Sequence, residues 1–148
     1  TVQENKLPAL REFLCTRLLA SSSEALVRER ELWVDLVLSP AAIQSDLVHD
    51  IERLGPFGQA NPTVRVLVPD VRNLKPQRVG EDHIKTLLVD SHSSARLSAI
   101  AFRCINRPLG EALLASAGQR VDVVGQLRLQ EWQGRPQLSL MLDDIRVV

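Results

Sequence analysis

Trp132 and Arg135 are the two residues of this sequence best suited to contact a nucleic acid. An indole ring offers an unpaired base a stacking surface worth ~1–3 kcal/mol, and a nearby arginine neutralises a phosphate or stacks on a second base. A structural alternative stays open, in which Trp132 covers one end of the folded domain and Arg135 is solvated. The spacing therefore defines a candidate binding pair rather than an active site.

Further basic side chains lie along two expected strands. Lys85 alternates with His83, so both project to the same side of one strand, and Arg96 shares a side with Ser98 on the next. That side is a candidate groove. The alternatives are that Lys85 is a solvated or edge-protecting charge and that His83 is a hydrogen-bonding group in a turn. The candidate nucleic-acid-binding residues are Trp132, Arg135, Lys85, Arg78, Lys75, Arg96 and His83.

No catalytic or metal-ligating constellation is evident in the sequence. Each of the three histidines is isolated from a second histidine at ligand spacing. Asp143 and Asp144 close an expected strand, where they cap a turn or pair with Arg146, since a metal site would need more oxygen ligands. We therefore predict no catalytic residue, no metal site and no cofactor within this chain.

The composition is that of a globular chain, with 148 residues, 45% apolar and 24% charged, which excludes a disordered or fibrous protein. No run reaches the ~20 apolar residues of a bilayer span. The chain opens Thr1-Val2-Gln3-Glu4 without an initiator Met or a signal sequence, and we expect it to be part of a longer protein. Cys15 and Cys104 lie in apolar surroundings without metal-ligand spacing, so we predict buried free thiols in the reducing cytoplasm.

The charge is balanced overall but unevenly distributed. The chain has 18 Lys and Arg against 18 Asp and Glu, for a net charge of zero. Residues 1–54 hold 6 basic and 9 acidic side chains, a net of −3, whereas residues 55–148 hold 12 basic and 9 acidic, a net of +3. The basic excess therefore lies in the C-terminal part, where the candidate binding residues also lie.

The first third of the chain predicts a helix, a strand and a second helix. Apolar residues at three-to-four spacing make Asn5–Ala20 an amphipathic helix. The β-rich run Glu31–Leu38 predicts a strand, with Trp33 in the core. Ser39 is expected to cap a second helix that begins at Pro40 and ends at Gly55-Pro56. Its apolar stripe comprises Ile43, Leu47, Ile51 and Leu54.

The segment after Leu54 predicts a domain boundary followed by a small β-barrel. Gly and Pro at positions 55, 56, 58 and 62 indicate a shaped turn. The element order that follows is three strands, one helix and two strands, which is that of the five-stranded OB-fold. We therefore predict an α+β chain, with an OB-fold barrel whose first-to-second and fourth-to-fifth strand loops flank the binding groove. The first of these loops is expected to carry Lys75, Arg78 and His83, and the second to carry Trp132 and Arg135. The strands are expected at Val64–Asn73, His83–Asp90, Arg96–Phe102, Gln119–Glu131 and Pro136–Val147, with the helix at Pro108–Ala117.

Three stretches resemble the RecJ family of single-strand-specific exonucleases. Leu54–Pro62 is similar to the family's Leu-Gly-Pro-Phe-Gly-x-Gly-Asn-Pro signature, with Ala60 in place of the usual glycine. Val79–Lys85 is similar to its Val-Gly-Lys-Asp-His-Leu-Lys stretch, and Glu131–Arg135 to its Asn-Glu-Trp-Asn-Gly-Arg hairpin. The spacing of the three stretches also fits, and the resemblance covers most of the chain.

The resemblance implies a function and a division of labour. RecJ proteins are DHH phosphoesterases that digest single-stranded DNA from its 5′ end in DNA repair and recombination, and they hold two divalent metals, Mn or Mg, with Asp-His-His motifs that are absent here. We therefore expect residues 1–54 to be the tail of the accessory, DHH-associated domain and residues 55–148 to be the OB-fold domain. This part would not hydrolyse DNA alone. It would guide single-stranded DNA to catalytic domains of the same chain.

An alternative from a different class is a protein-interaction module. The barrel would then close a ring around the catalytic core. Alternatively, it would bind the acidic tail of a single-strand-binding protein with the same arginines. An intact hydrolase is a poorer alternative, because no paired catalytic constellation is present. No membrane partner is expected.

Overall fold

The structure is a computed structural model that describes residues 6–21, 32–132 and 135–148. The chain divides into two compact units between Trp33 and Val34. Helix α1 (Leu7–Ser21) belongs to the first unit and matches the predicted helix closely. The prediction of a buried thiol at Cys15 is wrong: the thiol is exposed, because the described residues of its own unit offer α1 no surface to pack on.

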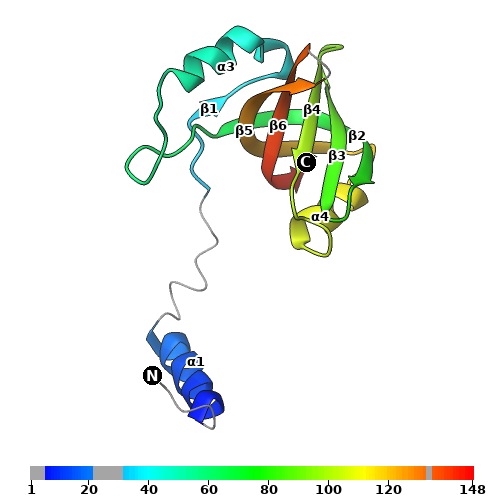
Figure 1. The fold of residues 1–148 in the computed structure, drawn as a ribbon. Coiled ribbons are helices and arrows are strands. Elements are labelled where there is room, and N and C mark those ends of the chain that lie inside the picture. The colour runs from blue at the N-terminus through cyan, green and yellow to red at the C-terminus, as the bar shows by residue number, and fades with distance from the viewer. Residues whose placement is uncertain (1–5, 22–31, 133–134) are drawn as a thin grey trace. The chain divides into compact units, whose positions relative to one another are not determined.

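The second unit is a closed barrel of five strands, which confirms the predicted OB-fold (Figure 1). Antiparallel pairs join β2 to β3, β3 to β4, β5 to β6 and β2 to β5, while β4 and β6 pair in parallel. Pairing of β2 with β5 closes the barrel. The strands are β2 (Val66–Val79), β3 (His83–Asp90), β4 (Arg96–Ala101), β5 (Arg120–Trp132) and β6 (Arg135–Val147).

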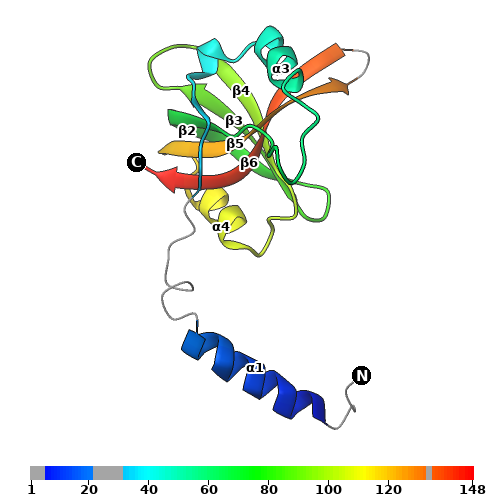
Figure 2. The same ribbon diagram turned by 90° about the vertical axis from the view of Figure 1, so that its left-hand side faces the viewer.

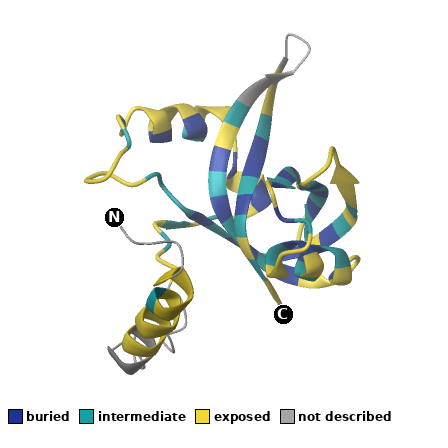
Figure 3. Cartoon of the chain, turned by 60° about the horizontal axis from the view of Figure 1, so that its bottom comes forward, coloured by how far each residue is buried: buried dark blue, intermediate teal, exposed yellow. Residues whose placement is uncertain are grey.

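Alternation of side chains along the strands builds the core. On β3, Ile84, Thr86 and Leu88 are buried, whereas His83 and Lys85 point outward and are half-buried. β-branched and aliphatic residues on the other strands repeat this pattern, as the alternating colours of Figure 3 show. The barrel interior is therefore filled by side chains, and its outward-facing residues are available for other contacts.

Helix α4 (Pro108–Ala115) lies between β4 and β5 in sequence and is fixed to the barrel by the buried side chain of Asn73. Asn73 Nδ2 donates hydrogen bonds to the carbonyl of Leu113 at 2.8 Å and to Ser116 Oγ at 2.9 Å. Asn73 Oδ1 accepts a hydrogen bond from Thr86 Oγ1. One side chain therefore ties together β2, β3 and the end of α4, with both its donor and its acceptor groups satisfied.

The segment that leads into the barrel packs on it. Strand β1 (Leu36–Val37) pairs in parallel with β2, and the 3₁₀ helix η2 (Pro40–Ala42) and helix α3 (Ser45–Glu52) follow. Figures 1 and 2 both place α3 and α4 at opposite ends of the barrel. Ile43, Val48 and Ile51 join the same buried cluster as the strands. Residues 34–54 thus share the barrel's core, and assigning residues 1–54 to an accessory domain stays a prediction.

Several local predictions for this segment are wrong. Trp33 is 79% exposed rather than buried, because the chain pairs with β2 only at Leu36 and Val37 and the indole precedes that pairing. Ser39 makes no capping hydrogen bond, and the α-helix begins at Ser45 instead of at Pro40. The predicted apolar stripe ends early, since Leu54 is exposed. No helix in the part of the chain that the structure describes is long and apolar enough to cross a membrane.

The turn between α3 and β2 is held by Asn61. Its Nδ2 donates hydrogen bonds to the carbonyls of Leu54 at 3.0 Å and Pro56 at 3.2 Å, and its backbone pairs with Gly58. Phe57 is half-buried against the core of the barrel. These contacts support an architectural role for the Gly-Pro-rich stretch, as the sequence predicts.

Candidate nucleic-acid interface

The outward-facing side chains of β3 and β4, together with the side chains beside them on β2, β6 and β5, form one surface, which we call the outer face. The strand register places these side chains in cross-strand rows. The rows are Val79, His83 and Phe102; then Gln77, Lys85, Ile100, Met141 and Gln126; then Leu74, Leu87, Ser98, Ser139 and Arg128; and last Arg72, Val89 and Arg96.

The predicted site residues are distributed over the outer face and its two ends. Lys85 lies within it, and Arg96 is at the end of β4 nearest the β3–β4 turn. Lys75, Arg78 and His83 gather at the other end, where β2 passes into β3. Their predicted position in the loop between the two strands is wrong, because the pairing of β2 with β3 extends to Val79 opposite His83 and these residues belong to the strands. The register of β2 shifts between Leu74 and Gln77, and Lys75 there adopts a φ of 52°. The structure therefore brings His83, Lys75 and Arg78 to one end, with Lys85 between them and Arg96.

The pair Trp132 and Arg135 closes the β5–β6 hairpin. Their backbones are opposite one another in the strand register, but their side chains lie outside the described residues. Their assignment as a binding pair stays a prediction. In an OB-fold the β5–β6 loop flanks the same face as the β2–β3 loop, which is consistent with the predicted placement.

His83 has two contacts that fix its ring. Its Nδ1 accepts a hydrogen bond from the backbone N–H of Arg103 at 3.1 Å, so in the neutral imidazole the proton resides on Nε2. The centroid of its ring lies 5.0 Å from the centroid of the Phe102 ring, and the angle between the two ring planes is 70°. The interpretation of His83 as a hydrogen-bonding group of a turn therefore describes the first contact, and the second contact was not anticipated.

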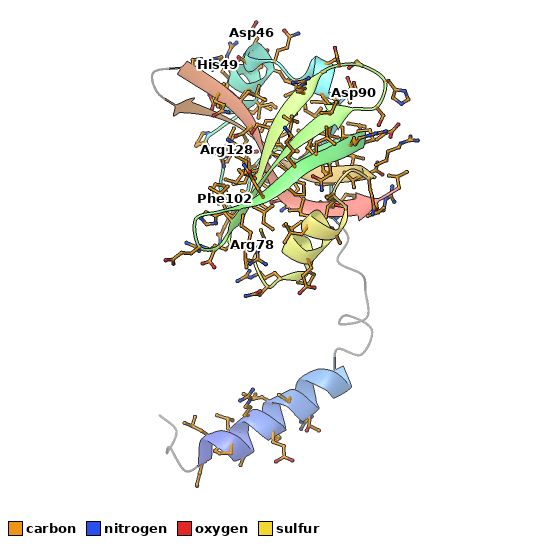
Figure 4. All side chains as sticks on the ribbon, turned by 90° about the vertical axis from the view of Figure 1, so that its right-hand side faces the viewer. Asp46, His49, Arg78, Asp90, Phe102 and Arg128 are labelled. Carbon is orange, nitrogen blue, oxygen red and sulfur yellow. The ribbon has the colours of Figure 1, made fainter. Side chains whose placement is uncertain are left out.

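Phe102 is the residue of this surface that the sequence reasoning missed. It follows β4 on the side shared by Ser98 and Ile100, and it is 43% exposed. The signal was the same alternation that placed Lys85 and Arg96, extended one step beyond the end of the strand. Figure 4 shows Arg128, Phe102 and Arg78 toward one side of the barrel and Asp90 toward the other.

Charges are segregated around the barrel. The carboxylates of Asp70 and Asp122 pair with Arg120 and Arg146, each at 2.5 Å, on strands β2, β5 and β6. The predicted pairing of Arg146 with Asp143 or Asp144 is wrong, because the β5–β6 register sets Arg146 opposite Asp122. Asp143 pairs with Arg65 at 3.0 Å, and Asp144 accepts a hydrogen bond from the backbone of Ile145.

The outer face carries the opposite pattern. None of the residues in its rows is a carboxylate. Within residues 6–21, 32–132 and 135–148, its basic side chains form no ion pair, although Arg128 donates a hydrogen bond to Gln126 at 3.3 Å. These unpaired side chains are Arg72, Lys85, Arg96 and Arg128, with Lys75 and Arg78 at the β2–β3 end. A net charge of zero therefore hides a local excess of positive charge.

We expect the ion pair of Asp70 with Arg120 to be visible in a titration. The hydrogen bond from Arg120 is the largest contribution that lowers the pKa of Asp70, to about 2, and His92 adds a further hydrogen bond at 2.8 Å. A lowered pKa means that this contact stabilises the fold above pH ~4 and that its contribution is lost as the pH falls toward 2. In Arg120→Ala the pKa of Asp70 should rise toward its ordinary value, as measured by carboxyl-carbon NMR. An unchanged titration would contradict the assignment.

The described residues contain no group of three or more His, Cys, Asp or Glu side chains that could hold a metal ion. Cys104 is buried as predicted, and its burial raises the pKa of the thiol. The geometry is thus that of a binding surface: a closed OB-fold barrel with a face whose cross-strand rows hold basic side chains and no carboxylate. Residues 34–144 match the RecJ OB domain, and the chain belongs to that family. The match begins at Val34, where the structure also divides.

Individual relatives agree with this assignment. The single-stranded-DNA-specific exonuclease RecJ of Bacillus subtilis is 27% identical over 114 residues, which are 77% of this chain and 14% of that protein. The structure of RecJ from Thermus thermophilus in complex with Mn²⁺ superposes with a TM-score of 0.60 at 22% identity, over 99% of this chain and 20% of that one. This chain therefore spans a small part of the length of either relative.

The fold itself is shared more widely. An asparaginyl-tRNA synthetase from Entamoeba histolytica, in complex with asparaginyl-adenylate, has a TM-score of 0.52 at 11% identity, over 78% of this chain and 24% of that one. At this identity the likeness concerns the barrel architecture alone. A function for this chain must therefore be argued from its own surface.

Proposed function

We propose that this chain is the OB-fold module of a RecJ-like single-strand-specific exonuclease and that it binds single-stranded DNA across the outer face. The observation that carries the proposal is the segregation of charge. Basic side chains such as Lys85 and Arg96 are unpaired on this face, whereas three carboxylates elsewhere on the barrel, those of Asp70, Asp122 and Asp143, are paired with arginines. Unpaired cations along a groove neutralise the phosphates of a single strand and release its counterions.

The floor of the face favours an unpaired strand over a duplex. Leu87, Val89, Ile100 and Met141 are half-buried, and they lie between the basic side chains. Apolar side chains in these positions contact the faces of exposed bases, which a duplex keeps stacked and inaccessible. The phosphates would then follow the cations while the bases lie on the apolar floor.

Digestion is assigned to other domains of the whole protein. We infer that a catalytic core with divalent metal, Mn or Mg, receives the strand that this module holds, in cytoplasmic DNA repair and recombination. The described residues of this chain supply no ligand cluster for such a metal. Their part in the reaction is to bind the single-stranded DNA and to guide it to the catalytic core.

A titration with labelled oligonucleotides tests the proposed function. We expect fluorescence anisotropy to report binding of single-stranded DNA in preference to duplex DNA, with log affinity falling linearly with log salt by ~0.7 for each phosphate neutralised. Affinity should also rise with oligonucleotide length up to the site size.

The same titration separates the proposal from the partner-docking alternative. An acidic peptide that models the tail of a single-strand-binding protein serves as the second ligand. Binding of that peptide without binding of DNA at low salt would overturn the proposal and favour an interaction module.

A further inference from the structure

We propose that Phe102 and His83 form a stacking platform for one unpaired nucleobase at the β2–β3 end of the outer face. This inference rests on the proposed function and deepens it, since it assigns a base-contacting site to residues other than the hairpin pair. The two rings meet because His83 begins β3 just before Ile84, and Phe102 directly follows Ala101, the residue opposite Ile84.

The platform is accessible. Phe102 is 43% exposed, and neighbouring Val79, opposite His83 in the register, is 38% exposed. In an edge-to-face pair at 70°, one of the two rings turns only its edge to its partner, so the contact between the rings does not use the faces of that ring. The row therefore presents two exposed apolar side chains, Val79 and Phe102, on either side of half-buried His83, at the edge of a basic surface.

The platform is also held in place before any ligand arrives. The two residues after Phe102 both form hydrogen bonds with the end of the β2–β3 connection. Arg103 donates its backbone N–H to His83 Nδ1. Cys104 donates its backbone N–H to the carbonyl of Asp82 at 2.9 Å. Cys104 is buried, and Arg103 has a φ of 49°, so the chain turns sharply just beyond the ring. A ring that is exposed yet fixed loses little conformational entropy when it binds, which favours stacking.

The surroundings select an unpaired nucleobase attached to phosphate. Arg78 and Lys75 are exposed at the same end and form no ion pair among the described residues. His83 Nε2, the protonated nitrogen of the neutral ring, has no hydrogen-bond partner in the described part of the chain and is free to donate to an oxygen of a nucleotide. Stacking on an aromatic ring tolerates any base, so the site should show little sequence preference.

The substitution Phe102→Ala tests the platform. We expect affinity for single-stranded DNA to fall by ~5-fold to ~100-fold, with the salt slope unchanged, because a base contact is lost and a phosphate contact is kept. In Phe102→Trp, which keeps an aromatic ring at this position, the affinity should stay close to that of the unaltered chain. The matched control is Phe13→Ala, which removes another exposed phenylalanine, 56% exposed, from α1 in the other unit. This control should leave the affinity unchanged.

A second measurement uses the unaltered chain. An oligonucleotide with one 2-aminopurine, moved stepwise along the strand, should show a position at which binding quenches its fluorescence by stacking, and Phe102→Ala should abolish that quenching. If the unaltered chain binds no single-stranded DNA, the proposed function itself fails. If it binds DNA, and Phe102→Ala changes neither the affinity nor the quenching, the function stands and the platform is wrong.

Discussion

The double substitution Lys85→Glu/Arg96→Glu is expected to lower the affinity for single-stranded DNA by ~100-fold or more at physiological salt. A hydrogen bond to a charged group contributes ~1.5–3 kcal/mol, and each reversal removes one such contact and adds repulsion. Both side chains lie on the outer face and form no ion pair among the described residues, so the reversals break no ion pair of the fold. Fluorescence anisotropy at several salt concentrations measures the effect.

The salt slope makes this prediction specific. Loss of two phosphate contacts should reduce the slope by ~1.4, since each contact contributes ~0.7 on a single strand. The matched control is Lys6→Glu/Arg11→Glu, which changes the net charge equally at two exposed positions of the other unit that form no ion pair among the described residues. Equal losses in both double variants would mean that binding follows the overall charge. No loss in either variant would exclude the outer face as the binding surface.

The barrel could be predicted from the sequence because its signal is local. Alternation of apolar and polar side chains gave β3 its observed bounds, His83–Asp90, and placed Lys85 and His83 on one side. The β-rich run around Trp33 looks the same locally, yet only Leu36 and Val37 have a partner strand. Whether an apolar residue is buried depends on what lies opposite, and a single stretch of sequence does not contain that information.

The site could be predicted only in part, for the same reason. The basic residues were recognised by type, but which of them are free to bind is decided by distant partners. Arg65 pairs with Asp143 across 78 positions, and Arg120 pairs with Asp70 across 50. Phe102 contacts His83, which precedes it by 19 positions in the sequence. Closure of the barrel creates these contacts.

Replacement of Asn73 is expected to have the largest effect on stability. In Asn73→Leu, the carbonyl of Leu113 and the hydroxyl of Ser116 lose the amide donor in the buried interior and keep only the longer hydrogen bond that joins them to each other, at 3.3 Å. Thr86 loses one of its two acceptors and keeps the carbonyl of Leu74. An unsatisfied buried polar group costs ~1–3 kcal/mol, so we expect the free energy of unfolding to fall by ~3 kcal/mol. Urea denaturation followed by far-UV circular dichroism measures the change. A loss below ~1 kcal/mol would contradict the argument.

A double-mutant cycle with Thr86→Val separates the network from simple packing. Thr86 retains its shape when its hydroxyl is replaced by a methyl group, and Thr86 Oγ1 is the donor that Asn73 Oδ1 accepts. Because Asn73→Leu already breaks this hydrogen bond, removing the hydroxyl as well should cost less in the double variant than in Thr86→Val alone. Additive losses would show that the two side chains act independently. Coupling of ~1 kcal/mol or more would establish that the hydrogen bond between Thr86 and Asn73 joins β3 to β2.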